Sequence, residues 1–351
     1  MKIRNKFAMI GLISVMFLVA CTGAYRPTTS QASDLRIGFY GMTLEFLKGS
    51  PPVKIFEGDS FPVTIKVKNN GAYSIKESNP AVISLGVEKD YTKNVKLEQY
   101  SGTSIPIYGS YAFEEQNAHF VIGGRTQINP RGGEEIIIYK LEAGKIDPKS
   151  EAHLSTVIAT LCYPYETILD STICVDTDIN NLRPIKKVCN MQDLIFNNGQ
   201  GAPVAITKIE MNMLPTETLE KITPQFLIYV ENKGNGLVIK NEAVFDYCIR
   251  SETKHEDLNI VYVDAYLSGK RLNCQLEKIE ELSPIEFGTK EIDSDKLGHI
   301  KLKDKKDIIR CALKEGIDRN QDPYLSPLKI RLWYGYTQSI SASYFIEGIL
   351  K

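Results

Sequence analysis

Apolar and polar residues alternate in short runs along much of the chain. The clearest runs are "VTIKV" at 63–67 and "LKIRL" at 328–332, in which every second residue is apolar. Successive side chains of a β-strand point to opposite faces, so this alternation predicts strands with one buried face. Similar runs stand at 134–141, 155–163, 259–267 and 340–349. Because no long amphipathic helix competes with them, the chain is expected to be all-β.

Two stretches of the first half return in the second half. "LCYPYET" at 161–167 matches "LWYGYTQ" at 332–338 with an offset of 171 residues. The pattern Val-x-Asn-x-Gly at 67–71 recurs at 230–234 with an offset of 163. Two matches in the same order with similar offsets indicate a duplicated domain whose second copy gained a few loop residues.

Turn signals separate the predicted strands in both copies, as at 69–71, 130–133 and 234–236. Short strands with such punctuation are typical of a sandwich of two antiparallel sheets. We therefore predict two tandem immunoglobulin-like β-sandwiches, at 34–177 and 204–351. Residues 178–203, rich in Asn, Gly and Pro, are predicted to form the linker.

The first residues have the pattern of an export signal. Lys2, Arg4 and Lys6 precede an apolar run at 7–19 that is short for a membrane span. "LVAC" at 18–21 fits the lipobox of prokaryotic lipoproteins, in which the cysteine is lipidated after cleavage. We expect a signal peptide at 1–21, lipidation at Cys21 and a flexible polar tether at 22–33. The alternative is an ordinary signal peptide that is cleaved near Ala24.

Export sets the expected state of the cysteines. Once Cys21 is assigned to lipid, six of the seven cysteines remain in a chain that leaves the reducing cytosol, and disulfides are expected. The candidates are Cys162, Cys174, Cys189, Cys248, Cys274 and Cys311. Metal binding is the weaker interpretation, since no C-x2-C pair and no Cys/His cluster occurs.

The alternation also predicts which way particular side chains point. If Leu328, Ile330 and Leu332 face the core, then Trp333 faces outward, and so does Cys162 at the matching position of the first copy. An outward Cys162 has Cys174 or Cys189 as its nearest candidate partner.

Cys274 and Cys311 have no counterparts in the first copy. We expect them to pair with each other and to close a charged, exposed insertion that contains residues 293–307.

Composition and charge limit the partners. Of 351 residues, 42 are Lys or Arg and 43 are Asp or Glu, so the net charge is -1. A chain without excess positive charge has no general attraction for phosphate backbones, and a nucleic-acid partner is not expected.

No motif predicts an enzyme or a cofactor. The four histidines, His119, His153, His255 and His299, stand in no metal-binding pattern, and a site joining Glu115 to His119 is disfavoured because that stretch is strand-like. The run at 318–323 begins like a calcium loop but has Pro323 in place of the required glycine, so a turn is favoured. We expect no catalytic residue, no metal and no cofactor.

The aromatic residues of the repeated strand allow two interpretations. Trp333, Tyr334 and Tyr336 could stack on sugar rings if they are exposed. The favoured interpretation is that they are strand formers that pack over the sheet or against the neighbouring domain.

Four stretches together resemble a known group of proteins. They are residues 41–75, 162–178, 199–210 and 322–336. They resemble secreted or membrane-anchored archaeal proteins with tandem immunoglobulin-like domains, and the first of them also resembles the adhesion-type modules called CARDB. The resemblance implies a fold and a location, but no reaction.

The sequence thus predicts a non-enzymatic, lipid-anchored protein on the outer face of the cell membrane. Its expected role is structural, adhesive or interaction-mediating, with an envelope protein or a polysaccharide as partner and with an oligomer left open. The membrane is reached through the lipid anchor only. The alternative function is an extracytoplasmic module that binds carbohydrate or another ligand.

Overall fold

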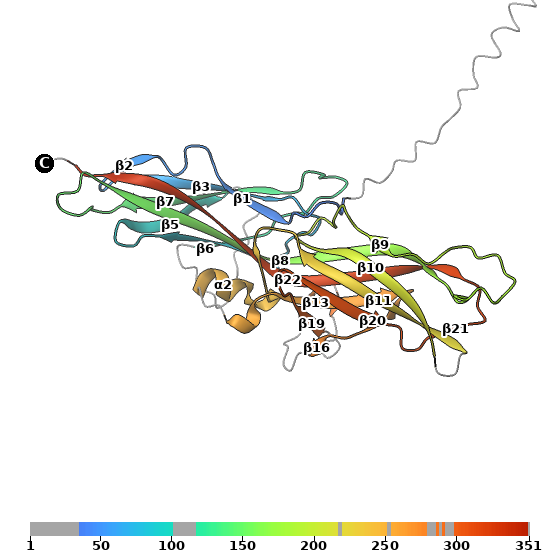
Figure 1. Cartoon of the computed structure of the whole chain (residues 1–351). Coiled ribbons are helices and arrows are strands. Elements are labelled where there is room, and N and C mark those ends of the chain that lie inside the picture. Colours follow the sequence, from blue (N-terminus) through green and yellow to red (C-terminus); the bar gives the residue numbers. More distant parts are fainter. Residues whose placement is uncertain are drawn as a thin grey trace, which may run out of the picture. The chain divides into compact units, whose positions relative to one another are not determined.

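Mostly antiparallel β-sheets dominate the computed structural model (Figure 1). The structure describes residues 35–100, 117–216, 220–250, 254–278, 286–287, 290–291 and 298–349. The predicted signal peptide, Cys21 and the tether lie outside these residues, and so does Glu115. The prediction of an all-β chain is confirmed.

A four-stranded antiparallel sheet is formed by the first half of the chain. Its strand order is β1 (Met42–Phe46), β3 (Ser60–Asn69), β7 (Glu134–Ala143) and β5 (Thr92–Tyr100). The predicted alternation at 63–67 is confirmed, because Val63, Ile65 and Val67 are fully buried while the residues between them are partly exposed.

The second half contributes a six-stranded sheet. It contains β15 (Asn273–Cys274), β20 (Lys306–Ala312), β11 (Lys221–Asn232), β10 (Val204–Pro215) and β9 (Leu194–Ile195), with β21 (Ile317–Asp318) paired to β11. Every pairing in this sheet is antiparallel. β10 and β11 take the places that β1 and β3 have in the first sheet.

A ten-stranded sheet faces both smaller sheets. Its main path is β16 (Glu277–Lys278), β19 (Gly298–Lys301), β13 (Ile260–Leu267), β22 (Tyr324–Glu347), β8 (Ala152–Val175), β4 (Ala81–Val87) and β6 (Asn117–Phe120). Its remaining strands are β2 (Lys54–Phe56) and β12 (Leu237–Ile239), both beside β22, and β14 (Lys270–Arg271) beside β13. β17 (Glu286–Phe287) and β18 (Lys290–Glu291) form a separate pair.

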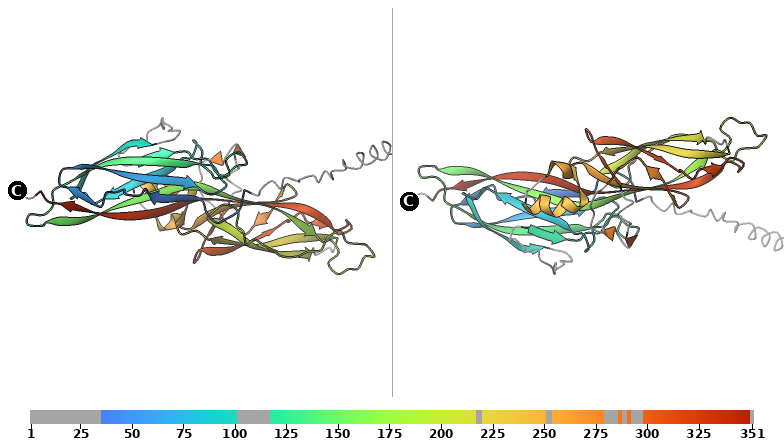
Figure 2. Two further views of the ribbon diagram at one scale, coloured as in Figure 1. Left: turned by 90° about the horizontal axis from the view of Figure 1, so that it is seen from above. Right: turned by 90° about the horizontal axis from the view of Figure 1, so that it is seen from below.

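We call the four-stranded sheet, together with the part of the ten-stranded sheet that faces it, the first lobe. The second lobe is the six-stranded sheet with the part that faces it. Two 24-residue strands, β8 and β22, run through both lobes and pair with each other along their whole length, from Ala152↔Glu347 to Val175↔Tyr324. Figure 2 shows these two strands connecting the lobes.

Each lobe contains the C-terminal half of the long strand that begins in the other lobe. The end of β22 lies in the first lobe, where Tyr344 contacts the Phe61 ring at 5.1 Å and hydrogen-bonds Thr92 at 2.6 Å. The end of β8 lies in the second lobe, where Thr167 donates to the Val204 carbonyl at 2.6 Å. Strand pairing therefore crosses the boundaries predicted at 177/178 and 203/204.

The long pair is centred on equivalent positions of the repeat. Pro164 pairs with Gly335, which stands 171 residues later, and Tyr163 and Tyr165 pair with Tyr336 and Tyr334. An antiparallel pair of equivalent segments has a local two-fold axis at its centre. The repeated aromatic strand therefore forms the junction of the two lobes, whose buried residues belong to one continuous core.

Short helical segments cover the outer face of the ten-stranded sheet near this junction. They are η1 (Asn241–Ala243), α2 (Val244–Arg250) and η2 (His255–Asp257). A Cβ atom on Gly335 would meet Val244 and Ile239, so glycine is needed where η1 and α2 approach β22. These segments have no counterpart among the described residues of the first copy.

Three disulfides fix the connections. Cys274–Cys311 joins directly opposite residues of β15 and β20 and confirms the predicted pair. Cys174–Cys189 links the segment at 178–203 to β8. Cys162 pairs with Cys248 of α2, not with Cys174 or Cys189, so the predicted partners of Cys162 are wrong.

Candidate interaction surface

The aromatic residues singled out from the sequence are buried. Trp333 is 2% exposed, Tyr334 0% and Tyr336 1%, and Cys162 is fully buried too. The prediction that Trp333 and Cys162 face solvent is wrong. An alternating strand leaves one face to solvent only if nothing covers that face, and here η1 and α2 lie over it. The guanidinium of Arg331 also lies over the Trp333 ring, 4.9 Å from its centre.

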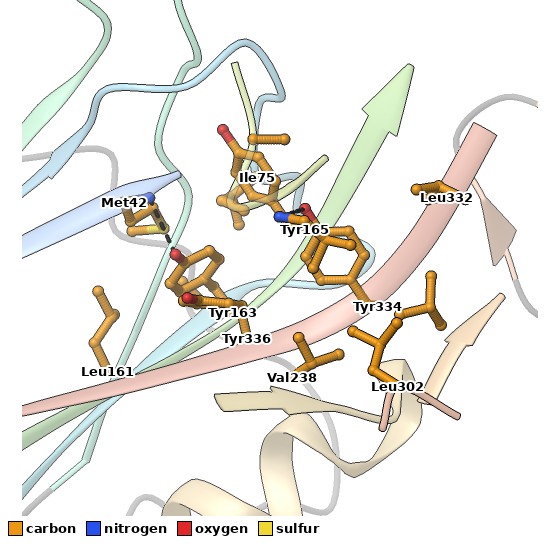
Figure 3. Packing of buried hydrophobic residues seen from close by; sticks show 14 of the residues in the cluster. Met42, Ile75, Leu161, Tyr163, Tyr165, Val238, Leu302, Leu332, Tyr334 and Tyr336 are labelled. Carbon is orange, nitrogen blue, oxygen red and sulfur yellow. Dashed lines mark hydrogen bonds between the residues drawn. The ribbon is translucent and has the colours of Figure 1, made fainter. Parts of the chain in front are cut away.

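The four tyrosines of the repeated strand form a cluster at the centre of the core (Figure 3). Ring centroids lie 5.5 Å apart for Tyr163 and Tyr165 and 6.4 Å apart for Tyr334 and Tyr336. The hydroxyl of Tyr163 accepts a hydrogen bond from the Met42 amide at 3.2 Å. Burial raises the pKa of Tyr163 and Tyr334 well above the usual value, so these hydroxyls stay neutral and act as hydrogen-bonding groups.

The Asn-x-Gly repeat completes this cluster in the first lobe. Asn69 Oδ1 accepts from the Tyr165 hydroxyl and from the Gly71 amide, each at 3.1 Å. Its Nδ2 donates to the Tyr73 carbonyl at 2.7 Å. Buried polar groups need such partners, which explains the asparagine and its spacing to the glycine.

The second lobe repeats the arrangement around Asn232. Its Oδ1 accepts from the Tyr336 hydroxyl and from the Gly234 amide, each at 3.1 Å, and its Nδ2 donates to the Gly236 carbonyl at 3.0 Å. Tyr73 and Gly236 are therefore equivalent positions. The tyrosine cluster supports the fold, and Trp333, Tyr334 and Tyr336 offer no exposed ring to a sugar.

The two lobes differ at this equivalent position. In the first lobe the Tyr73 ring packs edge-on against Tyr165, with centroids 5.5 Å apart. In the second lobe Gly236 has no side chain, and beside it lies a groove of about 380 Å³. The groove is lined by Leu44, Asn235, Gly236, Leu237, Tyr247, Thr337, Gln338, Ser339 and Ile340. None of these side chains is charged, so the groove suits an uncharged group.

The outer face of β8 and β22 in the first lobe is uncharged over four successive cross-strand pairs, up to Glu347 at the end of β22, which pairs with Lys54. We call it the neutral face and define it by four cross-strand pairs: Leu154↔Phe345, Thr156↔Ser343, Ile158↔Ser341 and Thr160↔Ser339. Leu154, Ile158 and Phe345 are 54%, 46% and 41% exposed. Charged residues make up 24% of the chain, so eight uncharged outward positions set this face apart from the average surface.

Hydroxyl pairs tie the neutral face together. Thr160 Oγ1 and Ser339 Oγ lie 2.8 Å apart, and Thr156 Oγ1 and Ser343 Oγ lie 3.3 Å apart. Ser339 also lines the groove, so the groove and the neutral face form one continuous uncharged surface.

The equivalent outer face of the second lobe carries ion pairs. Arg331 Nη2 lies 2.6 Å from the Glu166 carboxylate, and Lys329 Nζ lies 3.7 Å from Asp170. Burial raises the pKa of Glu166, while the Arg331 guanidinium opposes this rise. One copy thus has a polar, ion-paired face where the other has the neutral face. The sequence analysis missed this contrast, although aligning 154–160 with 325–331 residue by residue exposes it.

No metal centre is evident in the described part of the chain, where no group of three or more His, Cys, Asp and Glu side chains is placed to hold an ion. The ring of His119 stacks on Phe245, with centroids 5.2 Å apart. Asp318 Oδ1 accepts from the Asn320 amide at 2.8 Å, the geometry of the favoured turn. Among the same described residues, no helix is long and apolar enough to cross a membrane.

Glu135 on β7 is half-buried, and its buried Oε2 atom has no hydrogen-bond partner among the described residues. Burial raises its pKa from 4.5 to about 7. The folded chain therefore holds this proton at a pH where the unfolded chain has lost it, so rising pH lowers the free energy of unfolding between about pH 4.5 and pH 7. The full shift corresponds to about 3 kcal/mol, and partial solvent exposure reduces it to about 1 kcal/mol.

We expect Glu135→Gln to remove this pH dependence. The variant should be more stable than the wild type by about 1 kcal/mol at pH 8 and equally stable at pH 4. Urea denaturation followed by circular dichroism at both pH values measures the difference. Glu134→Gln, which changes an exposed neighbour 3.5 Å from Lys66, is the matched control and should show no gain at pH 8. An equal gain in both variants would contradict the assignment to Glu135.

Comparison with known proteins adds no family. No family model matches the chain, and no curated protein matches it. Among solved structures, the C-terminal domain of the antigen I/II-family protein AspA from Streptococcus pyogenes aligns with 6% identity and a TM-score of 0.22, covering 89% of this chain and 98% of that one. A conserved protein of unknown function from Pseudomonas aeruginosa PAO1 aligns with 8% identity and a TM-score of 0.11, covering 86% and 90%. Scores this low assign neither a fold nor a function.

Proposed function

We propose that the chain is a non-enzymatic interaction protein of the cell envelope, held on the outer face of the membrane through lipid at Cys21. Its two lobes are proposed to be tandem immunoglobulin-like sandwiches that exchange their last strands. The neutral face and the groove beside it are proposed to bind an envelope protein. The observation that carries this proposal is the exposed, uncharged neutral face on β8 and β22. The equivalent face of the second lobe carries ion pairs instead.

Three observations support this proposal. Three disulfides are typical of an oxidising compartment outside the cytosol. Exposed Leu154, Ile158 and Phe345 lie within one small surface, and grouped apolar side chains mark interaction sites. The carbohydrate alternative loses its main support, because Trp333 is 2% exposed and offers no ring to a sugar.

The proposal predicts that charge on the neutral face weakens binding to the envelope. The double variant Thr156→Lys/Ile158→Lys should bind a membrane-stripped envelope fraction of the producing cells at least about tenfold more weakly, because each buried ammonium group must lose its water. Raising the salt concentration should change wild-type binding little, since uncharged contacts are not screened. Sedimentation of labelled full-length chain with the fraction measures both effects.

Thr172→Lys is the matched control, because Thr172 occupies the position of the second lobe that is equivalent to Ser343. It should bind like the wild type. Equal binding by the double variant, or wild-type binding that is lost in high salt, would contradict the proposed surface. In a separate fractionation of whole producing cells, Cys21→Ser should move the protein from the membrane pellet to the supernatant.

A further inference from the structure

One side of β22 is left without a neighbouring strand over seven residues. β8 pairs with the whole of β22 on its other side. On the side in question, β13 pairs up to Trp333, β12 pairs at Gly335–Thr337, and β2 pairs at Phe345–Glu347. No described strand pairs with this side between Gln338 and Tyr344. We call this stretch the open edge.

Backbone groups of the open edge point toward this vacant side. The Phe345 amide donates to the Val53 carbonyl at 2.9 Å, and the Glu347 carbonyl accepts from the Glu57 amide at 3.0 Å. Because backbone direction alternates along a strand, Ser339, Ser341 and Ser343 aim their amide and carbonyl groups to the same side. These groups are therefore available to an added strand.

The open edge lacks the usual protection of an exposed strand. Native edge strands are commonly guarded by charged residues or proline against pairing with other chains. The sequence "QSISASY" at 338–344 has neither. The equivalent stretch of β8, 167–173, contains Asp170, which lies 2.5 Å from Arg36 and 3.7 Å from Lys329. The stretch of β8 therefore carries a protective charge, whereas the equivalent stretch of β22 does not.

The strands that flank the open edge leave room for one added strand. β12 and β2 lie in line at its two ends, so the vacant side is a slot about seven residues long, roughly 23 Å. Antiparallel pairing of two copies about Ser341 would set residue 345 of each copy against residue 337 of the other. β2 and β12 of one copy would then occupy the same space as β22 of the other, so a second copy cannot pair here edge to edge.

The groove described above lies at the β12 end of the slot, since Gln338, Ser339 and Ile340 line it together with Leu237. A strand added to the slot would place one side chain there. The uncharged lining selects an apolar or small side chain, and the absence of charge on the neutral face selects an uncharged segment.

We infer that the open edge of β22 is a strand-addition site for an extended, uncharged segment of a partner polypeptide, with one of its side chains in the groove. This inference rests on the proposed interaction function and names the chemistry of its partner. Main-chain hydrogen bonds to Ser339, Ser341 and Ser343 supply affinity, and the groove supplies selectivity.

Amide exchange measured by nuclear magnetic resonance tests whether the edge is open. In the free full-length chain, the amides of Ser339, Ser341 and Ser343 should exchange at least about a hundredfold faster than those of Ile340, Ala342 and Tyr344, which point to β8. Protection of Ser341 equal to that of Ala342 would mean that the edge is already covered and would overturn the inference.

A peptide-binding assay tests whether the open edge binds an extended, uncharged segment. The probe is a pool of capped nonapeptides of Val, Ile, Thr, Ser and Ala in which apolar and polar residues alternate, applied to immobilised full-length chain and read by mass spectrometry. Ser341→Pro removes an amide that faces the slot and leaves the β8 pairing intact. Ser341→Ala keeps that amide. Retention should be equal for wild type and S341A and at least about tenfold lower for S341P.

Two outcomes of the peptide assay would overturn the inference: no peptide retained by the wild type, or equal retention by S341P. A wild-type dimer that dissociates in S341P would assign the edge to a second copy and would also overturn it. If the peptide assay contradicts the inference, the proposed function is still supported when the Lys variants of the neutral face lose envelope binding. Those variants change β8 alone, so the two results are separable.

Discussion

Asn69→Ala is expected to lower the free energy of unfolding by about 3–4 kcal/mol. The side chain is fully buried and joins Tyr165, Gly71 and the Tyr73 carbonyl. Alanine leaves all three groups without this partner, and each unsatisfied buried group costs about 1–3 kcal/mol. Guanidinium denaturation at constant pH measures the change.

The neighbouring Asn70 provides the control. Its Nδ2 donates one bond to Thr43 at 2.8 Å in a partly exposed position, so Asn70→Ala should cost about 1 kcal/mol or less. Asn232→Ala should resemble Asn69→Ala, because Asn232 makes the same three bonds in the second lobe. A smaller loss for Asn69→Ala than for Asn70→Ala would exclude the proposed role of the buried asparagine.

Removal of the Cys162–Cys248 disulfide is expected to have an effect of similar size. The bond closes a loop of 86 residues and holds α2 on the ten-stranded sheet, whereas Cys174–Cys189 closes a loop of only 15. Since the entropy of loop closure rises with loop length, Cys162→Ala/Cys248→Ala should lose about 4.5 kcal/mol and Cys174→Ala/Cys189→Ala about 3 kcal/mol. Denaturation under oxidising conditions gives both values.

Amide exchange separates the two losses. Exchange should accelerate in α2 only when the Cys162–Cys248 bond is absent, because it is the one of these three disulfides that links α2 to the sheet. Peptide mapping should first confirm the three pairs in the wild type. A larger loss of stability from the shorter loop would show that strain or residual structure, and not loop length, decides the order.

The internal duplication supports the interpretation of the surface. Both lobes keep the tyrosine cluster and the Asn-x-Gly turn, because these groups satisfy one another inside the core. The outer faces are under no such restraint, and they differ: Ser341 stands where the other copy has Asp170, and Gly236 where it has Tyr73. The groove, the neutral face and the open edge are therefore among the places where the two copies have diverged.

The amino-acid sequence by itself determined the strands, the duplication and the Cys274–Cys311 pair. Alternation of apolar and polar residues is a local property, so the buried face of β3 and that of β22 up to Leu332 could be predicted from it. The same alternation gave a wrong prediction of exposure for Trp333 and Cys162, because η1 and α2 cover the outer face of their strands.

Only the tertiary structure decided which strands pair across the two copies. Alternation gives a strand its inner and outer faces but not its neighbours, and β8 and β22 each satisfy the same pattern in either lobe. The exchange of their ends, the Cys162–Cys248 bond and the open edge all follow from pairing between residues far apart in the chain. A local sequence pattern does not specify such contacts, because they depend on how the sheets pack in the folded structure.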